Sequence, residues 1–150
     1  MNLYLTAMKN SLLTLSLFIS TICFGQSTIP KKEVPNAVVT SYLSQNSKGA
    51  QDSVWSKETI TIFKVNYIDD GKRYQAHYLS DGKWVKTFTE IVQVELLPNI
   101  TNQIIDLYPD HKIVKSYIEL NNDGKFYATD LRKGKDEITV YFTTSGKFFK

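Results

Sequence analysis

Apolar residues recur every three to four positions in two short stretches of this chain. Ile100, Ile104 and Leu107 form a one-sided stripe in the second half, and Val38 and Tyr42 form one in the first. This spacing is typical of a helix that buries one face. The sequence therefore predicts two short helices, the second ending before a proline, because the residue ahead of a proline disfavours the helical region.

Alternating apolar and polar residues follow each predicted helix, as expected for strands with one buried face. Asp-Gly and Ser-Gly steps separate many of the alternating runs, and they favour tight hairpin turns, which need positive φ. The expected strands are 51–57, 59–68, 73–79 and 83–88 in the first half, and 112–120, 126–131, 137–143 and 147–150 in the second.

The second half of the chain also matches the first in order. Pro35-Asn36 matches Pro98-Asn99, and Gly71-Lys72 matches Gly134-Lys135, both at an offset of 63 residues (98 minus 35, and 134 minus 71). A period of this length indicates a supersecondary unit used twice. The sequence therefore predicts an α+β fold of two tandem repeats, about 27–90 and 91–150. Each repeat is one helix plus a four-stranded antiparallel meander, and together they form a curved sheet with helices on one face.

Counting back from each expected turn assigns side chains to faces. Around Asp70-Gly71, the predicted core pairs are Tyr67 with Tyr74, Val65 with Ala76, and Phe63 with Tyr78, and the next hairpin sets Tyr78 opposite Val85. A three-residue turn near Lys133–Lys135 sets Tyr127 opposite Tyr141 on the other face, and the residues then expected on the core face are Phe126, Ala128, Val140, Phe142 and Phe149. Clustered aromatics on the opposite face suggest a contact surface. The candidate partner-binding residues are His77, Leu79, Trp84, Tyr127, Tyr141 and Phe148.

Residues 1–26 are predicted to be a cleaved export signal. A single charge, Lys9, precedes a run from Leu12 to Phe24 that is apolar or hydroxylic throughout. About thirteen residues are too few to cross a ~30 Å hydrocarbon core as a helix, but they suit the apolar part of a signal peptide. We therefore expect an exported protein, periplasmic or secreted, whose mature chain 27–150 is a single domain without a membrane span.

The order of these motifs resembles that of the PepSY-like proteins grouped with the β-lactamase-inhibitor-like fold. The resemblance covers about 120 residues, and its motifs are Val34-Pro35, Leu97-Pro98, Leu107-Tyr108-Pro109, Asn122-Asp123-Gly124, Asp81-Gly82-Lys83-Trp84 and Ser145-Gly146-Lys147-Phe148. It implies two helix-plus-sheet repeats and a secreted, non-catalytic protein that binds other proteins or peptides. True β-lactamase inhibitors of this shape carry disulfides, so that target is not carried over to a mature chain without cysteine.

Composition narrows the range of partners. The chain has 18 Lys and Arg against 15 Asp and Glu, and its formal charge of +3 falls to +2 once Lys9 is removed. These charges are interspersed, whereas nucleic-acid binding requires a concentrated basic patch, so no nucleic-acid partner is expected. The single cysteine, Cys23, lies in the predicted signal, and the mature chain therefore relies on its core without a disulfide.

Patterns that carry catalysis or metal binding are missing from the sequence. Neither His77 nor His111 belongs to a His-x-x-x-His pair, and no Gly-x-Ser-x-Gly elbow occurs. Asp69-Asp70-Gly71 and Asn121–Gly124 lack the alternating acids and distal glutamate of a calcium loop, and turn chemistry accounts for them. We expect no catalytic residue, no cofactor and no metal.

The leading hypothesis is an exported, non-catalytic binding module. It would hold a protein or peptide of the cell envelope on a sheet face, as an inhibitor or an envelope-stress factor. A periplasmic small-ligand or metal sensor that uses His77 is one alternative. An exported hydrolase with an unrecognised site is another.

The export hypothesis predicts the mass of the mature protein. Cys23-Phe24-Gly25 places small residues at the −3 and −1 positions of a cleavage site, so the mature chain should begin at Gln26 or Ser27. Intact-mass spectrometry of the exported protein tests this, whether translation starts at Met1 or at Met8. A diacylglycerol adduct on Cys23, the mark of a lipoprotein, would contradict it.

Overall fold

The computed structural model describes residues 27–46 and 53–149, so the predicted signal peptide lies outside it. Two ten-residue helices, α1 (Asn36–Gln45) and α2 (Pro98–Leu107), each follow a short 3-10 turn, η1 (Lys31–Glu33) and η2 (Gln93–Glu95). The described part of the chain contains no helix with the length and apolar character needed to cross a membrane.

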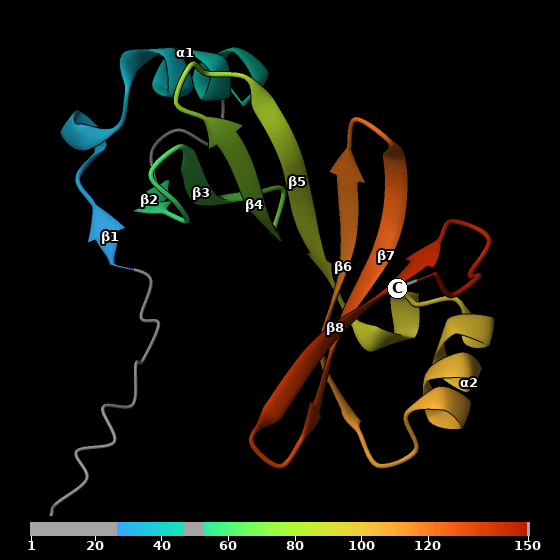
Figure 1. Ribbon diagram of the computed structural model, residues 1–150. Coiled ribbons are helices and arrows are strands. Elements are labelled where there is room, and N and C mark those ends of the chain that lie inside the picture. The colour runs from blue at the N-terminus through green and yellow to red at the C-terminus, as the bar shows by residue number, and fades with distance from the viewer. Residues whose placement is uncertain (1–26, 47–52, 150) are drawn as a thin grey trace, which may run out of the picture.

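The strands form a single antiparallel sheet in the order of the sequence (Figure 1). Sheet order and chain order coincide because each strand pairs with the next along the chain. The strands are β1 (Thr28–Ile29), β2 (Val54–Lys57), β3 (Ile62–Asp69), β4 (Lys72–Leu79), β5 (Trp84–Ile91), β6 (Lys112–Asn121), β7 (Gly124–Lys133) and β8 (Asp136–Thr143).

This architecture corrects the predicted fold. The α+β class is right, but two repeats of one helix plus a four-stranded meander is wrong, because eight strands form one continuous sheet. A strand, β1, precedes α1 and pairs with β2, and three strands rather than four follow α2. The expected strand 147–150 contributes an isolated bridge between Phe142 and Phe148. Gln103 of α2 accepts a hydrogen bond from the Phe148 backbone N–H at 3.3 Å, so the helix holds this segment and the ladder ends there.

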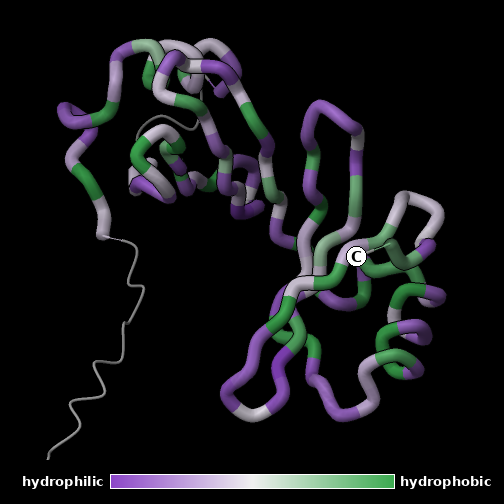
Figure 2. The backbone as a smooth tube through the Cα atoms, viewed as in Figure 1, coloured by the Kyte–Doolittle hydropathy of each residue, from purple (hydrophilic) through white to green (hydrophobic). Residues whose placement is uncertain are grey.

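Both helices pack on the same face of the sheet, here called the helix face. Figure 2 shows apolar and polar positions interspersed along the strands. Successive side chains of a strand point to opposite faces, so the buried apolar residues gather on one side of the sheet. Under α1 the buried cluster comprises Val34, Val38, Tyr42, Trp55, Phe63, Val65, Tyr67, Ala76 and Tyr78. Under α2 it comprises Ile91, Leu96, Ile100, Ile104, Leu131, Val140 and Phe142. The opposite side, which neither helix covers, is the open face.

The β3–β4 hairpin confirms the predicted register, with Tyr67 opposite Tyr74 and Phe63 opposite Tyr78. The next hairpin differs, because a β-bulge shifts the β4–β5 register beside Tyr78 and sets Trp84, rather than Val85, opposite it. A bulge places two residues of one strand against one of its partner, so the side chains that follow change face. Trp84 therefore packs on the helix face against the α1 cluster.

The β7–β8 hairpin also differs from its prediction by one residue. Lys133 pairs with Asp136, which makes the turn two residues long instead of three. A one-residue slip reverses the face of every side chain on one strand. Tyr127 consequently pairs with Phe142 under α2, while Tyr141 pairs with Ala128. The residues predicted to share a core face are thus divided: Val140 and Phe142 lie on the helix face, and Phe126, Ala128 and Phe149 do not.

Two hairpin turns hold the N-terminal ends of the helices. Gly82 in the β4–β5 turn adopts φ +89°, and a Cβ built there would lie 2.6 Å from the backbone oxygen of Ala37 in α1. Gly146, at φ +77°, lies against Asn99 of α2, whose Nδ2 donates to the Ser145 carbonyl at 3.1 Å. Glycine is needed at Gly82 for both reasons, its positive φ and the close backbone contact.

These contacts predict unequal costs for two glycine substitutions. Gly82→Ala should lower the free energy of unfolding by about 3 kcal/mol, because it combines backbone strain with a clash against main chain. Gly71→Ala is the matched control, since Gly71 has φ +73° but no atom within 4 Å of the added Cβ, and it should cost about 1 kcal/mol. Urea unfolding measures both values. Equal losses would show that the α1 contact does not stabilise the fold.

Candidate functional site

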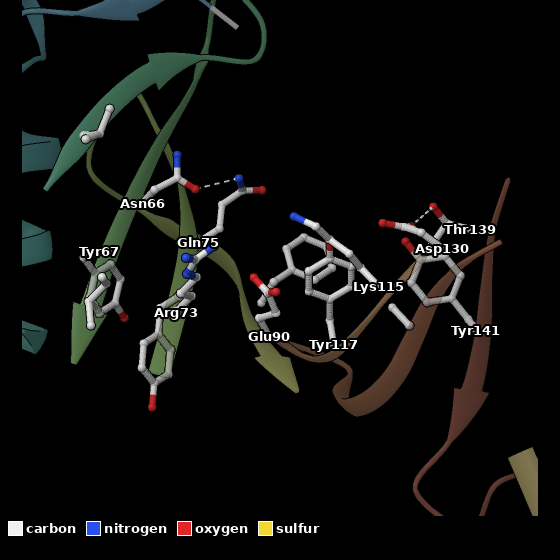
Figure 3. A pocket seen from close by; sticks show the side chains of 15 residues that line it. Asn66, Tyr67, Arg73, Gln75, Glu90, Lys115, Tyr117, Asp130, Thr139 and Tyr141 are labelled. Atoms are coloured by element: carbon white, nitrogen blue, oxygen red, sulfur yellow. Dashed lines mark hydrogen bonds between the residues drawn. The ribbon is translucent and has the colours of Figure 1, made fainter. Parts of the chain in front are cut away.

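A groove of about 540 Å³ lies on the open face and draws residues from β2 through β8. Figure 3 shows Asn66, Arg73 and Gln75 on one side of it, and Lys115, Asp130 and Tyr141 on the other, with Glu90 between. Its position follows from the fold, because the helices leave this face uncovered. A concave site of this size with a few convergent polar groups is the usual form of a binding site.

Aromatic side chains supply much of the wall. Phe88 of β5 and Tyr117 of β6 meet edge to face across the strand boundary, with ring centroids 5.8 Å apart and planes at 66°. Tyr141 lies further along on β8, next to Phe149 at 6.1 Å. Phe88, Tyr117 and Tyr141 line the groove from the open face, whereas Tyr67 and Tyr74, which also line it, belong to the α1 cluster on the helix face. Large rigid rings of this kind are the side chains that most often anchor a bound partner.

The groove carries charges of both signs. Within the part of the chain that the structure describes, Arg73, Glu90 and Lys115 make no ion pair. Asp130 is engaged, because it accepts a hydrogen bond from the Thr139 hydroxyl at 2.7 Å. Two cations and one anion therefore remain available to an occupant.

The hydroxyls of Tyr117 and Tyr141 stay protonated over a wide pH range. Burial, followed by the charge of Asp130 and a hydrogen bond to it, raises the pKa of Tyr117. Burial and the charges of Glu119 and Asp130 raise the pKa of Tyr141. A protonated phenol both donates and accepts hydrogen bonds, so these rings offer polar contacts as well as apolar surface.

His77 lies beside the groove in a connected group of side chains. It is 3% exposed, and its Nδ1 lies 2.8 Å from Oε2 of Glu58. Its Nε2 lies 3.0 Å from Oε1 of Gln75, and Nε2 of Gln75 lies 2.8 Å from Oδ1 of Asn66. Asn66 and Gln75 line the groove, so the buried histidine is linked to the groove through two amides.

The surroundings of His77 disfavour a charged ring. Lys64 on β3 and Lys86 on β5 are its direct cross-strand neighbours. Burial and the ammonium groups of Lys86 and Lys64 lower the pKa of His77 to about 4, although the carboxylate of Glu58 acts in the opposite direction. At neutral pH the ring is therefore uncharged, and Nδ1–H donates to Glu58.

The six predicted binding residues do not share one face. His77, Leu79 and Tyr141 lie on the open face, and of these Tyr141 lines the groove. The expected face is wrong for the other three, because the bulge and the two-residue turn place them with the cores. Trp84 packs on the α1 cluster, and Tyr127 and Phe148 pack on the α2 cluster. Any role of these six residues in binding remains a prediction.

Several groove residues were missed by the sequence reasoning. Phe88 and Glu90 face Glu119 and Tyr117 across the β5–β6 ladder. The segment from 92 to 111, which contains α2, separates β5 from β6 in the sequence. Their register therefore could not be predicted from a short turn. The signal that was available is the alternation within each strand, which puts Tyr117 and Glu119 on one face of β6.

No protein-family model and no curated protein matches the sequence. Among solved structures, a DUF2874 family protein from Bacteroides ovatus is similar, with a TM-score of 0.65 and 16% identity over 77% of this chain and 84% of that one. A BLIP-like protein from Bacteroides fragilis matches with a TM-score of 0.63 and 16% identity over 81% and 85%. A predicted periplasmic protein from Bacteroides eggerthii matches with a TM-score of 0.67 and 14% identity over 78% and 86%. At such identities the likeness shows the fold, which is BLIP-like.

Among residues 27–46 and 53–149, no three His, Cys, Asp or Glu side chains gather in a way that could hold a metal ion. Glu119 is a buried carboxylate on the open face. Its Oε1 accepts a hydrogen bond from Asn121 at 2.8 Å, and its Oε2 lies 3.8 Å from Nζ of Lys86. The Glu119 carboxylate partly neutralises the Lys86 ammonium, which also lies 4.6 Å from the centroid of the Phe88 ring.

The lowered pKa of His77 predicts a loss of stability in mild acid. The unfolded chain takes up the proton near pH 6.5, whereas the folded protein does so near pH 4, so protonation favours unfolding. The contribution is complete above pH 6.5 and is lost as the pH falls toward 4. Between pH 7 and pH 5 the loss should be on the order of 2 kcal/mol. Urea unfolding at several pH values measures it, and His77→Gln should flatten the dependence. An unchanged slope in that variant would assign the effect to other groups.

Proposed function

We propose that this chain is an exported, non-catalytic binding module that holds an extended protein or peptide segment in the groove of its open face. The observation that carries the proposal is the groove itself, with aromatic walls and charges that have no ionic partner in the described chain. The mature chain, 27–150, would act as a single domain, as an inhibitor or envelope-stress factor.

The extent of the groove favours an extended occupant. Its lining runs from Val54 on β2 to Tyr141 on β8, across seven strands. Neighbouring strands lie about 4.8 Å apart, so even a twisted sheet gives a span on the order of 20 Å. An extended chain advances about 3.3 Å per residue, and about six peptide residues would fill this span.

The chemistry of the lining also suits a peptide. A segment that crosses the strands cannot join the sheet ladder, so side chains must satisfy its amide groups. Asn66, Gln75 and the hydroxyl of Tyr117 can do so, while the free charges of Arg73 and Glu90 would select among partner side chains.

Export and binding have support of different kinds. The predicted signal peptide supports export, and a predicted periplasmic protein has the same fold. The BLIP-like neighbour supports a protein-binding, non-catalytic role by analogy of fold, which is weaker evidence than the site itself. The groove volume also lies in the range of small-molecule sites, so a small-ligand sensor is the second candidate.

Peptide selection tests the proposal. Displayed random 12-residue peptides would be selected for binding to the mature protein. The affinity of each selected peptide would then be measured for the wild type and for the Tyr117→Ala/Tyr141→Ala double variant. Loss of these two anchors should weaken binding at least ~30-fold, or ~2 kcal/mol. Arg73→Ala/Lys115→Ala provides a second groove variant at exposed positions, where the fold is not at risk.

The matched control is Val94→Ala/Ile105→Ala, which removes apolar side chains that are 90% and 60% exposed and lie outside the groove lining. It should bind the peptides like the wild type. Peptides whose affinity falls with the control and not with the groove variants would place binding elsewhere. Selection that yields no groove-dependent peptide would favour the small-ligand sensor.

A further inference from the structure

Four side chains form an unbroken hydrogen-bonded row from a buried histidine to the groove. Glu58 contacts Nδ1 of His77 at 2.8 Å, and Nε2 of His77 lies 3.0 Å from the side-chain amide of Gln75. The other end of that amide lies 2.8 Å from the side-chain amide of Asn66. His77 and Glu58 line a separate pocket, whereas Gln75 and Asn66 line the groove.

Each contact in this row constrains the next, because an amide has a donor end and an acceptor end of the same shape. In the structure, the oxygen of Gln75 faces Nε2 of His77 and its nitrogen faces the oxygen of Asn66. That arrangement requires a proton on Nε2, and Nδ1 already needs one to donate to Glu58. It therefore suits the doubly protonated, charged ring.

A neutral ring requires the opposite orientation of the Gln75 and Asn66 amides. With Nδ1–H donating to Glu58, Nε2 becomes an acceptor, so Gln75 must present its amino group to it. The Gln75 oxygen then faces Asn66 and must receive the Asn66 amino group. The remaining polar atom of Asn66, its carbonyl oxygen, is left for an occupant of the groove.

The charged groups around His77 decide between the two arrangements. Lys64 faces it from β3 and Lys86 from β5, while Glu58 faces it from the segment between β2 and β3. Glu119 of β6 lies behind Lys86 at 3.8 Å and partly offsets that ammonium. Since His77 is 3% exposed and is flanked by a lysine on each neighbouring strand, water cannot stabilise a third positive charge there.

We propose that Asn66 determines the hydrogen-bond polarity of the groove and that neutral His77 sets it through Gln75. At neutral pH the groove then presents a carbonyl oxygen at Asn66, and its occupant supplies an N–H donor, such as a peptide amide. His77 is a positioning residue, since it acts through Gln75. The statement about the occupant rests on the proposed function, whereas the orientation of the amides does not.

Acid reverses this polarity. Protonation of His77 turns both amides to the alternative arrangement, so Asn66 presents its amino group instead. An occupant matched to the neutral form then faces a donor with its own donor. Binding through this position should weaken once the ring is charged.

Nuclear magnetic resonance of the intact mature protein tests the row without any ligand. At pH 7 the ring ¹⁵N shifts of His77 should show the neutral Nδ1–H tautomer. The Gln75 amino hydrogens should give cross-relaxation to the ring, and the Asn66 amino hydrogens should donate toward Gln75. A charged ring at pH 7, or the neutral Nε2–H tautomer, would overturn the proposal.

Asn66→Asp tests transmission along the row, because the carboxylate that it introduces can only accept hydrogen bonds. Gln75 must then donate to this carboxylate and turn its oxygen to His77, which forces a proton onto Nε2. The pKa of His77 should rise by about one unit or more. Arg73→Gln is the matched control, since it makes the same −1 change in charge on the same face of the sheet and should shift the pKa by only a few tenths.

Equal shifts in the two variants would show that Asn66 acts through charge alone, and the proposal would fail. Both measurements report on His77 and involve no bound partner. Their results can therefore contradict the proposed amide orientation even if the groove binds peptides. Conversely, the row can behave as proposed in a protein that binds no peptide. The two proposals are therefore tested separately.

Discussion

The six paired positions between β5 and β6, from Lys86–Asn121 to Ile91–Ser116, are the contact on which the rest of the structure depends. The α1 cluster lies on one side of this ladder and most of the α2 cluster on the other. The ladder makes the two parts one sheet, and it also brings Phe88 against Tyr117 on the open face. A loss of this pairing would separate the two parts and open the groove along its middle.

The helices account for the difference between the two faces. Because α1 and α2 both pack on the helix face, both buried apolar clusters lie there, and the open face carries aromatic, amide and charged residues together with exposed apolar ones such as Ile68. That face buries Lys64, His77 and Glu119 without a helix above them, because neighbouring side chains on the twisted sheet cover one another. Buried ionisable groups on a sheet surface are costly unless they are paired: Lys64 lies near Glu58 and Glu119 near Lys86, while the neutral His77 donates to Glu58. Their arrangement gives the groove a defined electrostatic setting.

Local patterns were sufficient for several elements. Apolar residues at spacings of three and four indicated both helices to within a few residues, since an amphipathic stripe and a following proline are local signals, although Leu107, expected in the buried stripe, is 53% exposed. Asp70-Gly71 gave the β3–β4 register, because a two-residue turn fixes pairing between adjacent strands. In the candidate site, the same reasoning placed His77 on the open face.

The sequence by itself therefore determined the α+β class, the two helices and the adjacent hairpin of β3 and β4. The tertiary structure decided the single eight-stranded sheet, the faces of Trp84 and Tyr127, and the groove. The physical reason is that a strand's faces alternate with a period of two, so one bulge or one turn residue reverses every later assignment. Packing against α1 and α2 decides which face of each strand is buried. The pairing of β5 with β6 joins strands that α2 separates in the sequence, so no local pattern could predict it.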